Sequence, residues 1–106
     1  MKVREILELI DAGKHNELDA EIKMRWINDV EGRVACEIMK KEATEYAPLL
    51  GEEEELSIPD AYVRVYLLYA WAMIELLAGN LESYGAMNRN YESEFMMYAR
   101  YVIRNR

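Results

Sequence analysis

The stretch from 62 to 80, YVRVYLLYAWAMIELLAGN, constrains the fold more than any other part of the chain. Ten uncharged residues lie between Arg64 and Glu75, which is about half the length that a bilayer-spanning helix needs. The stretch is therefore too short for a membrane span. It is apolar on nearly every face of a helix, so it must be buried from several sides. We predict that a helix over 59–79 forms the centre of a small helical domain.

The rest of the chain predicts three more helices and no strand. Apolar residues at steps of three and four indicate helices over 2–12 and 19–45. Tyrosines that recur every seven residues give 81–104 an apolar stripe of the same kind. The expected fold class is all-α, with residues 1–106 in a single four-helix domain.

The residues between these segments indicate how the helices begin and end. Pro59 suits the first turn of the central helix, and Gly79 followed by Asn80 suits a left-handed cap at its end. The tight turn predicts that the central and C-terminal helices pack antiparallel. Gly32 in the second helix predicts a kink or a close packing contact. Residues 46–58 hold four consecutive glutamates, which indicates an exposed acidic loop.

The charge is distributed unevenly along the chain. The net charge is −7, and residues 1–58 account for all of it with 15 acidic and 8 basic residues, while residues 59–106 are neutral. The last seven residues contain three arginines and no acid. Such polarity fits either a solvated acidic face or head-to-tail contacts between chains, and the sequence leaves both open. The candidate contact charges are Glu52, Glu53, Glu54, Glu55, Arg100 and Arg104.

The residues that carry chemistry are sparse. His15 is the only histidine and Cys36 the only cysteine, which excludes multi-histidine metal sites and a disulfide framework. The glutamate run lacks the spacing of a calcium loop. Glu75, in the most apolar helix, fits either an acid of raised pKa or an ion pair with a base such as Arg89. We predict no catalytic residue, no metal, no cofactor, no small-molecule substrate and no sequence-specific nucleic acid, with His15 in an exposed loop and Cys36 in the core.

Aromatic residues are the strongest remaining signal. Seven of the eight tyrosines lie within 59–106. Tyrosine is common both around a bundle core and between subunits, because its ring can be buried while its hydroxyl finds a polar partner. The candidate core or interface aromatics are Trp26, Tyr62, Tyr66, Tyr69, Trp71, Tyr84, Tyr91, Tyr98 and Tyr101.

Scattered positions along the whole chain agree with one family pattern. They are Val3–Ile6 (VREI), Trp26 in EIKMRWINDVEGRV, Leu56, Pro59, Tyr62, Tyr66, Tyr69, Ala72, Ile74, Gly79, Asn80, Tyr84 and Tyr91. With these residues the chain resembles the head–tail connector proteins (adaptor or head-completion proteins) of tailed phages and prophages of Gram-positive bacteria. Gly85 and Ala86 depart from the pattern, because the family more often has a polar pair there.

The resemblance implies a helical subunit that is made in the cytoplasm of the bacterial host and is then built into the head–tail junction of the virion. It implies a ring, twelvefold in symmetry, on the portal, with portal or tail-completion proteins as partners and no enzyme activity. The matched aromatic residues would then be packing and interface positions. The acidic composition leaves a second hypothesis open, a small regulatory binding module of the antitoxin or inhibitor type that masks a basic partner.

Overall fold

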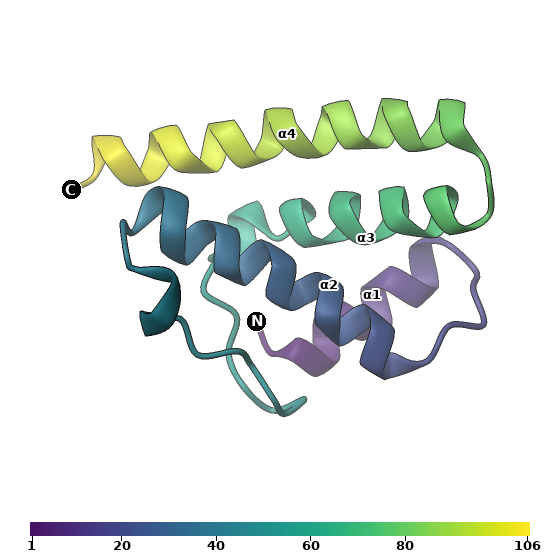
Figure 1. Ribbon diagram of the computed structural model, residues 1–106, viewed down its shortest axis with the longest axis horizontal. Helices are drawn as coiled ribbons and strands as arrows, with labels where there is room; N and C mark the ends of the chain where they lie inside the picture. Colours follow the sequence, from purple (N-terminus) through teal and green to yellow (C-terminus); the bar gives the residue numbers. More distant parts are fainter.

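The computed structural model describes residues 1–106 and is all-α, as predicted (Figure 1). The four helices are α1 (Val3–Gly13), α2 (Ala20–Arg33), α3 (Arg64–Leu77) and α4 (Leu81–Arg104). Three short helical segments join them: a π-helical turn η1 (Val34–Ile38) and the 3-10 turns η2 (Ala43–Glu45) and η3 (Asp60–Tyr62). The only β-type pairing is an isolated antiparallel bridge between Lys2 and Glu55.

Helix α3 lies at the centre of the molecule, which confirms the main prediction from its apolar sequence. It runs antiparallel to α4 on one side and packs against α1 and α2 on the other (Figure 1). Half of its 14 residues are buried. The turn into α4 contains Gly79 with φ of 81°, a left-handed conformation that costs glycine little. The α-helix begins at Arg64, later than expected, because Pro59 precedes the separate turn η3.

The second helix is shorter than its sequence predicts. We expected it to run to residue 45, but the helical structure that begins at Ala20 ends at Ile38. Lys40 there adopts φ of 59°, and the Lys41 N–H donates to the Ala35 carbonyl at 2.9 Å, which closes the helix end. The apolar stripe reaches Ile38 but has no equivalent beyond it, so nothing holds the following residues in a helix.

The wide turn η1 also changes what its residues contact. We predicted Cys36 in the core, but it is only half-buried, because Val34 and Ile38 take the buried positions of this turn. Gly32, just before it, was predicted to give a kink or a close packing contact, but the space beside it would accept an ordinary side-chain contact. A Cβ at this position would lie 3.5 Å from the ring of Tyr46.

The acidic loop is exposed, as predicted, but it is held firmly against α1. The N–H groups of Val3 and Arg4 donate to the carbonyls of Glu54 and Glu52 at 2.9 and 2.8 Å, and the Leu56 N–H donates to the Met1 carbonyl at 2.9 Å. Leu56 and the nearby Ile58 are buried in the core. The loop is therefore a fixed layer of the fold.

The buried side chains form one continuous core of 21 residues that draws on all four helices and on the loop before α3. Its largest fully buried members are Tyr66 and Phe95. This single core agrees with one domain. None of the helices combines the length and the apolar character that crossing a lipid bilayer requires.

Candidate interaction surface

The structure divides the candidate aromatic residues into three groups. The buried ones, each at most 5% exposed, are Trp26, Tyr66, Tyr91 and Tyr98. The half-buried ones are Tyr62, Tyr69, Trp71 and Tyr84. Tyr101 is 41% exposed. Three of these seven tyrosine rings are therefore buried in the subunit's own core, and the other four remain partly accessible to a partner.

Tyr66 anchors the loop before α3 to α2. Its hydroxyl donates to the carboxylate of Glu31 and accepts the N–H of Ile58 at 3.1 Å. The carboxylate also accepts hydrogen bonds from the N–H and the hydroxyl of Ser57. Burial and the charge of Glu31 raise the pKa of Tyr66 far above its ordinary value, so the phenol stays a donor. This cluster cannot be predicted from sequence patterns, because Glu31 lies in a segment of alternating charges and nothing marks it as buried.

Two of the half-buried tyrosines, Tyr62 and Tyr69, pack beside the buried ones. The Tyr62 ring lies 5.3 Å from that of Tyr98 and 5.1 Å from that of Tyr101. Tyr69 packs edge-on against Tyr91 and donates to the carboxylate of Asp29 at 2.7 Å. These contacts extend the seam between α3 and α4 out to the molecular surface.

Arg33 fastens α2 to α4. Its guanidinium donates to both carboxylate oxygens of Glu92, at 3.0 and 2.9 Å, and to Glu37 at 2.8 Å. The same group lies over the ring of Phe95, 3.9 Å from its centroid. Such a planar, bidentate arrangement is specific to arginine. Arg33 therefore lies on the side of α4 that faces α2. The opposite side of α4 is uncovered.

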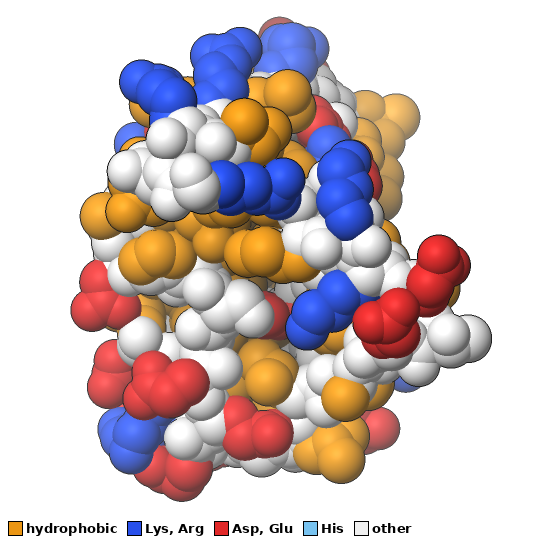
Figure 2. All heavy atoms as spheres, turned by 90° about the vertical axis from the view of Figure 1, so that its left-hand side faces the viewer, with side chains coloured by type: hydrophobic (Ala, Val, Ile, Leu, Met, Phe, Trp, Pro, Cys, Tyr) orange, Lys and Arg blue, Asp and Glu red, His pale blue; other side chains and the backbone are white.

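That uncovered side, which we call the outer face of α4, combines apolar and basic side chains. Its members are Met96, Met97, Arg100, Tyr101, Ile103 and Arg104. The four apolar members are 41% to 61% exposed. The ion pairs of α4 use Glu92 and Glu94, so Arg100 and Arg104 have no acidic partner within the chain. Figure 2 shows basic side chains gathered over α4 at the top, with hydrophobic ones between them, and acidic ones mainly lower down.

Most glutamate side chains of the acidic loop have partners within the chain. Glu53 pairs with Lys2 at 2.9 Å and Arg4 at 3.0 Å, and these two partners lower its pKa. Glu55 pairs with the terminal amino group at 3.2 Å, and Glu54 accepts two backbone N–H groups of its own turn. Of the four glutamates predicted as contact charges, Glu52 alone has a carboxylate with neither a cation nor a hydrogen-bond donor beside it. The other three have their carboxylates occupied inside the subunit.

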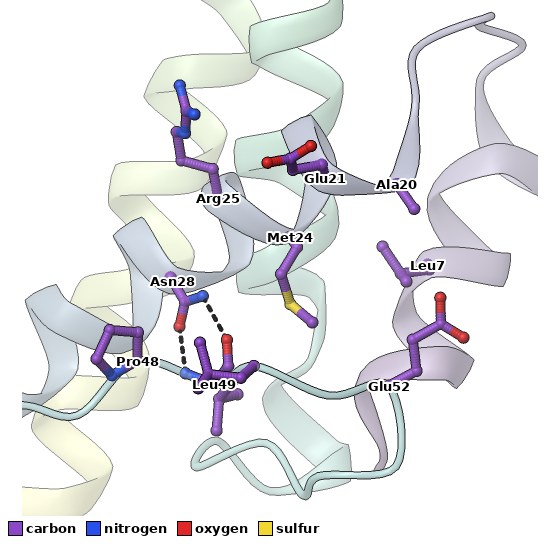
Figure 3. Close-up of a pocket in the computed structure, with 10 residues that line it drawn as sticks. Leu7, Ala20, Glu21, Met24, Arg25, Asn28, Pro48, Leu49 and Glu52 are labelled. Carbon is purple, nitrogen blue, oxygen red and sulfur yellow. Dashed lines mark hydrogen bonds between the residues drawn. The ribbon is translucent and has the colours of Figure 1, made fainter.

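Glu52 lies at the edge of a hollow, which we call the α1–α2 groove, of about 590 Å³. Its walls are α1, the start of α2 and the loop around residues 48–52 (Figure 3). Met24 points into it from α2, and Leu7 lies across from it on α1. The lining residues are Leu7, Ala20, Glu21, Met24, Arg25, Asn28, Pro48, Leu49, Leu50 and Glu52.

Asn28 fixes the shape of this groove. Its amide donates to the Leu49 carbonyl at 2.9 Å and accepts the Leu49 N–H at 2.8 Å. The Tyr46 hydroxyl donates to the same side-chain oxygen at 2.6 Å. Burial, followed by the charges of Glu31 and Asp29, raises the pKa of Tyr46 to about 12. The loop wall is therefore preformed.

The structure also places two further residues that the sequence singled out, Glu75 and His15. Glu75 pairs with Lys14 at 2.6 Å and accepts the Asn80 amide at 2.8 Å, so its partner is not Arg89. These contacts lower its pKa, which is opposite to what an acid catalyst requires. His15 is exposed in the α1–α2 connection, as predicted.

The chain matches no known protein-family model, no curated protein and no solved structure. No group of three or more His, Cys, Asp or Glu side chains is placed to hold a metal ion. The features that stand out are two surfaces, the outer face of α4 and the α1–α2 groove. Both combine exposed apolar side chains with charged ones.

Proposed function

We propose that this chain is a non-enzymatic structural subunit, a head–tail connector or adaptor of a tailed phage, which assembles as a ring on the portal. The observation that carries the proposal is the outer face of α4. Four large apolar side chains stand exposed there beside two unpaired arginines. A single chain gains nothing from such a surface, whereas an assembling subunit buries it.

Three other features support the same proposal. The fold is a small all-α domain with a central aromatic helix, as the connector resemblance implies. The acidic and basic ends of the molecule lie apart, which suits contacts between unlike flanks of neighbouring subunits (Figure 2). The groove and loop are held in shape by internal hydrogen bonds, so a partner would meet a preorganised surface. The expected final location is the virion head–tail junction.

The test is co-assembly with the portal protein encoded in the same genome. The purified chain and the portal are mixed, separated by sedimentation and imaged by electron microscopy. We expect the chain to co-sediment with the portal and to add a ring of density to one end of it. The portal alone and the chain alone are the controls.

Failure to co-sediment at micromolar concentrations of both proteins would remove the connector assignment. A 1:1 complex with a basic protein from the same genome, with no ring at any concentration, would instead favour the regulatory binding module. The net charge of −7 is the feature that this second function would use. The two functions therefore differ in stoichiometry as well as in partner.

A further inference from the structure

We propose that the outer face of α4 on one copy docks into the α1–α2 groove of a second copy, so that subunits join head to tail. This inference rests on the proposed function, since it names the contact through which the ring would form. It identifies one occupant for both surfaces, namely another copy of this chain.

The two surfaces agree in their apolar content. The groove has Leu7 and Met24 on its walls and Leu50 at its edge, and Leu50 is 87% exposed. The outer face of α4 offers Met97 at 50% and Ile103 at 61% exposure. Leucine and methionine side chains adapt to one another, and burial of such area drives association.

The charges of the two surfaces are complementary. Arg100 and Arg104 have no acidic partner within the chain, and Glu21 and Glu52 at the groove have no basic one. The neighbouring charges are already used: Lys23 pairs with Asp11 at 2.8 Å, and Arg4 pairs with Glu53 at 3.0 Å and lies 3.9 Å from Glu8. Arg25 is the one unpaired base that lines the groove. It opposes the attraction and provides a test of opposite sign.

The positions of the surfaces determine the kind of contact. Helix α4 forms one outer layer of the molecule, while the groove lies among α1, α2 and the loop, on the other side of α3 (Figure 1). A chain cannot reach its own groove with its own α4. A contact between two different surfaces is heterologous, and it produces a ring when the rotation closes.

The overall acidity of the chain does not prevent this contact. Two copies of charge −7 repel one another at a distance. At physiological ionic strength that repulsion is screened beyond about 8 Å, whereas charges that face each other across a contact are not. Association is therefore measured at about 0.15 M salt, where the local complementarity decides the outcome.

The experiment uses charge-reversal variants of the full chain and sedimentation velocity over a range of concentrations. The groove variant carries Glu21→Lys and Glu52→Lys, and the helix variant carries Arg100→Glu and Arg104→Glu. Each should raise the dissociation constant by roughly tenfold or more. Arg25→Glu should lower it severalfold. The control matched to the groove variant, Glu17→Lys with Glu82→Lys, makes the same charge change at exposed residues elsewhere and should leave association unchanged.

A mixture of the two defective variants provides the sharpest test. The helix variant keeps an intact groove and the groove variant keeps an intact α4, and the two reversed surfaces are again opposite in charge. The mixture should therefore associate although neither variant associates well alone. Thermal melts confirm folding, and Glu21→Gln with Glu52→Gln replaces the groove variant if that variant melts early.

Three outcomes overturn the proposed contact: a wild-type chain that stays monomeric up to about 1 mM, charge variants that associate like the wild type, or a mixture that fails to pair. Any of these can occur while the chain still binds the portal. In that case the connector function stands and only this contact is lost. Loss of portal binding with intact self-association would have the opposite meaning.

Discussion

The phenol of Tyr66 donates a hydrogen bond to the carboxylate of Glu31 in a region where neither side chain reaches solvent. Their exposed fractions are 1% and 4%. No cation pairs with this carboxylate; Ser57 supplies the remaining hydrogen bonds through its N–H and hydroxyl. A buried charge is tolerated when hydrogen bonds replace its hydration. The cluster joins α2, α3 and the loop between them at one point.

Replacing Tyr66 by Phe should therefore destabilise the protein although the ring is kept. The change removes a donor to Glu31 and leaves the Ile58 N–H without its acceptor. We expect the free energy of unfolding in urea to fall by about 1–3 kcal/mol. Tyr62→Phe is the matched control, because the Tyr62 hydroxyl makes no hydrogen bond within the chain, and it should be nearly neutral. Equal stabilities of the two variants would show that the cluster contributes nothing.

The tyrosines of α4 should separate into core and surface positions. Tyr91→Ala and Tyr98→Ala each empty a buried site and should cost about 3–5 kcal/mol of unfolding free energy. Tyr101→Ala removes a ring that is 41% exposed and packs against Tyr62, so it should cost less than about 1.5 kcal/mol. Circular dichroism melts and urea titrations measure both. A loss at Tyr101 as large as that at Tyr91 would contradict this division.

Local patterns predicted the helices well, whereas distant contacts escaped them. The apolar character of α3 on every face was enough to place it at the centre, because only burial from several sides accommodates such a helix. The end of the helical stretch formed by α2 and η1 was predicted seven residues too late, because the left-handed turn at Lys40 carries no glycine or asparagine signal.

The candidate site shows the same limit. Exposed aromatic and basic residues on α4 could be found by their spacing, but not which tyrosines were buried. The partners of Glu53 and Glu75 were missed, since Lys2 lies 51 positions and Lys14 lies 61 positions away along the chain. Periodicity predicts which face of a helix is apolar. It does not predict which charged groups the connecting segments bring together.

Gly13 should not tolerate the methyl group of alanine, because the ring of Trp71 lies against it. A Cβ at Gly13 would lie 2.2 Å from the Trp71 ring, which is held in place by its N–H bond to the Ile10 carbonyl at 3.1 Å. We expect Gly13→Ala to cost about 1–3 kcal/mol through overpacking. Gly51→Ala, whose Cβ would meet its nearest neighbour at 3.9 Å, is the control and should be neutral.

A double-mutant cycle tests the cause of that cost. In a Trp71→Leu background the added methyl group has room, so Gly13→Ala should cost clearly less there than in the wild type. If the two changes are additive, the close approach of the ring is not the reason for glycine at this position.

Acid should weaken the fold through its ion-paired carboxylates. Lys14 and Asn80 lower the pKa of Glu75, and Lys2 and Arg4 lower the pKa of Glu53. A lowered native pKa means that the stabilisation is fully present above 4.5, the ordinary value for glutamate, and is lost as the pH falls through the native pKa. Urea midpoints measured from pH 7 to 2 should therefore drop below about pH 4.5.

Glu75→Gln isolates one contribution to that pH dependence. The variant should show a shallower loss of stability in acid, while Glu17→Gln, at an exposed position without an ion pair, should follow the wild type. An unchanged slope for Glu75→Gln would mean that the Lys14 contact is not maintained in solution.

The bridge between the acidic loop and the start of α1 has a consequence for the order of folding. Helices α3 and α4 are neighbours in the chain, so their hairpin can form from local contacts alone. The pairing of Val3 and Arg4 with Glu54 and Glu52 closes a loop of about fifty residues, which carries an entropic cost that the α3–α4 hairpin does not have. We therefore expect α1 to be the last helix to reach its position, and to leave together with the acidic loop when the domain opens.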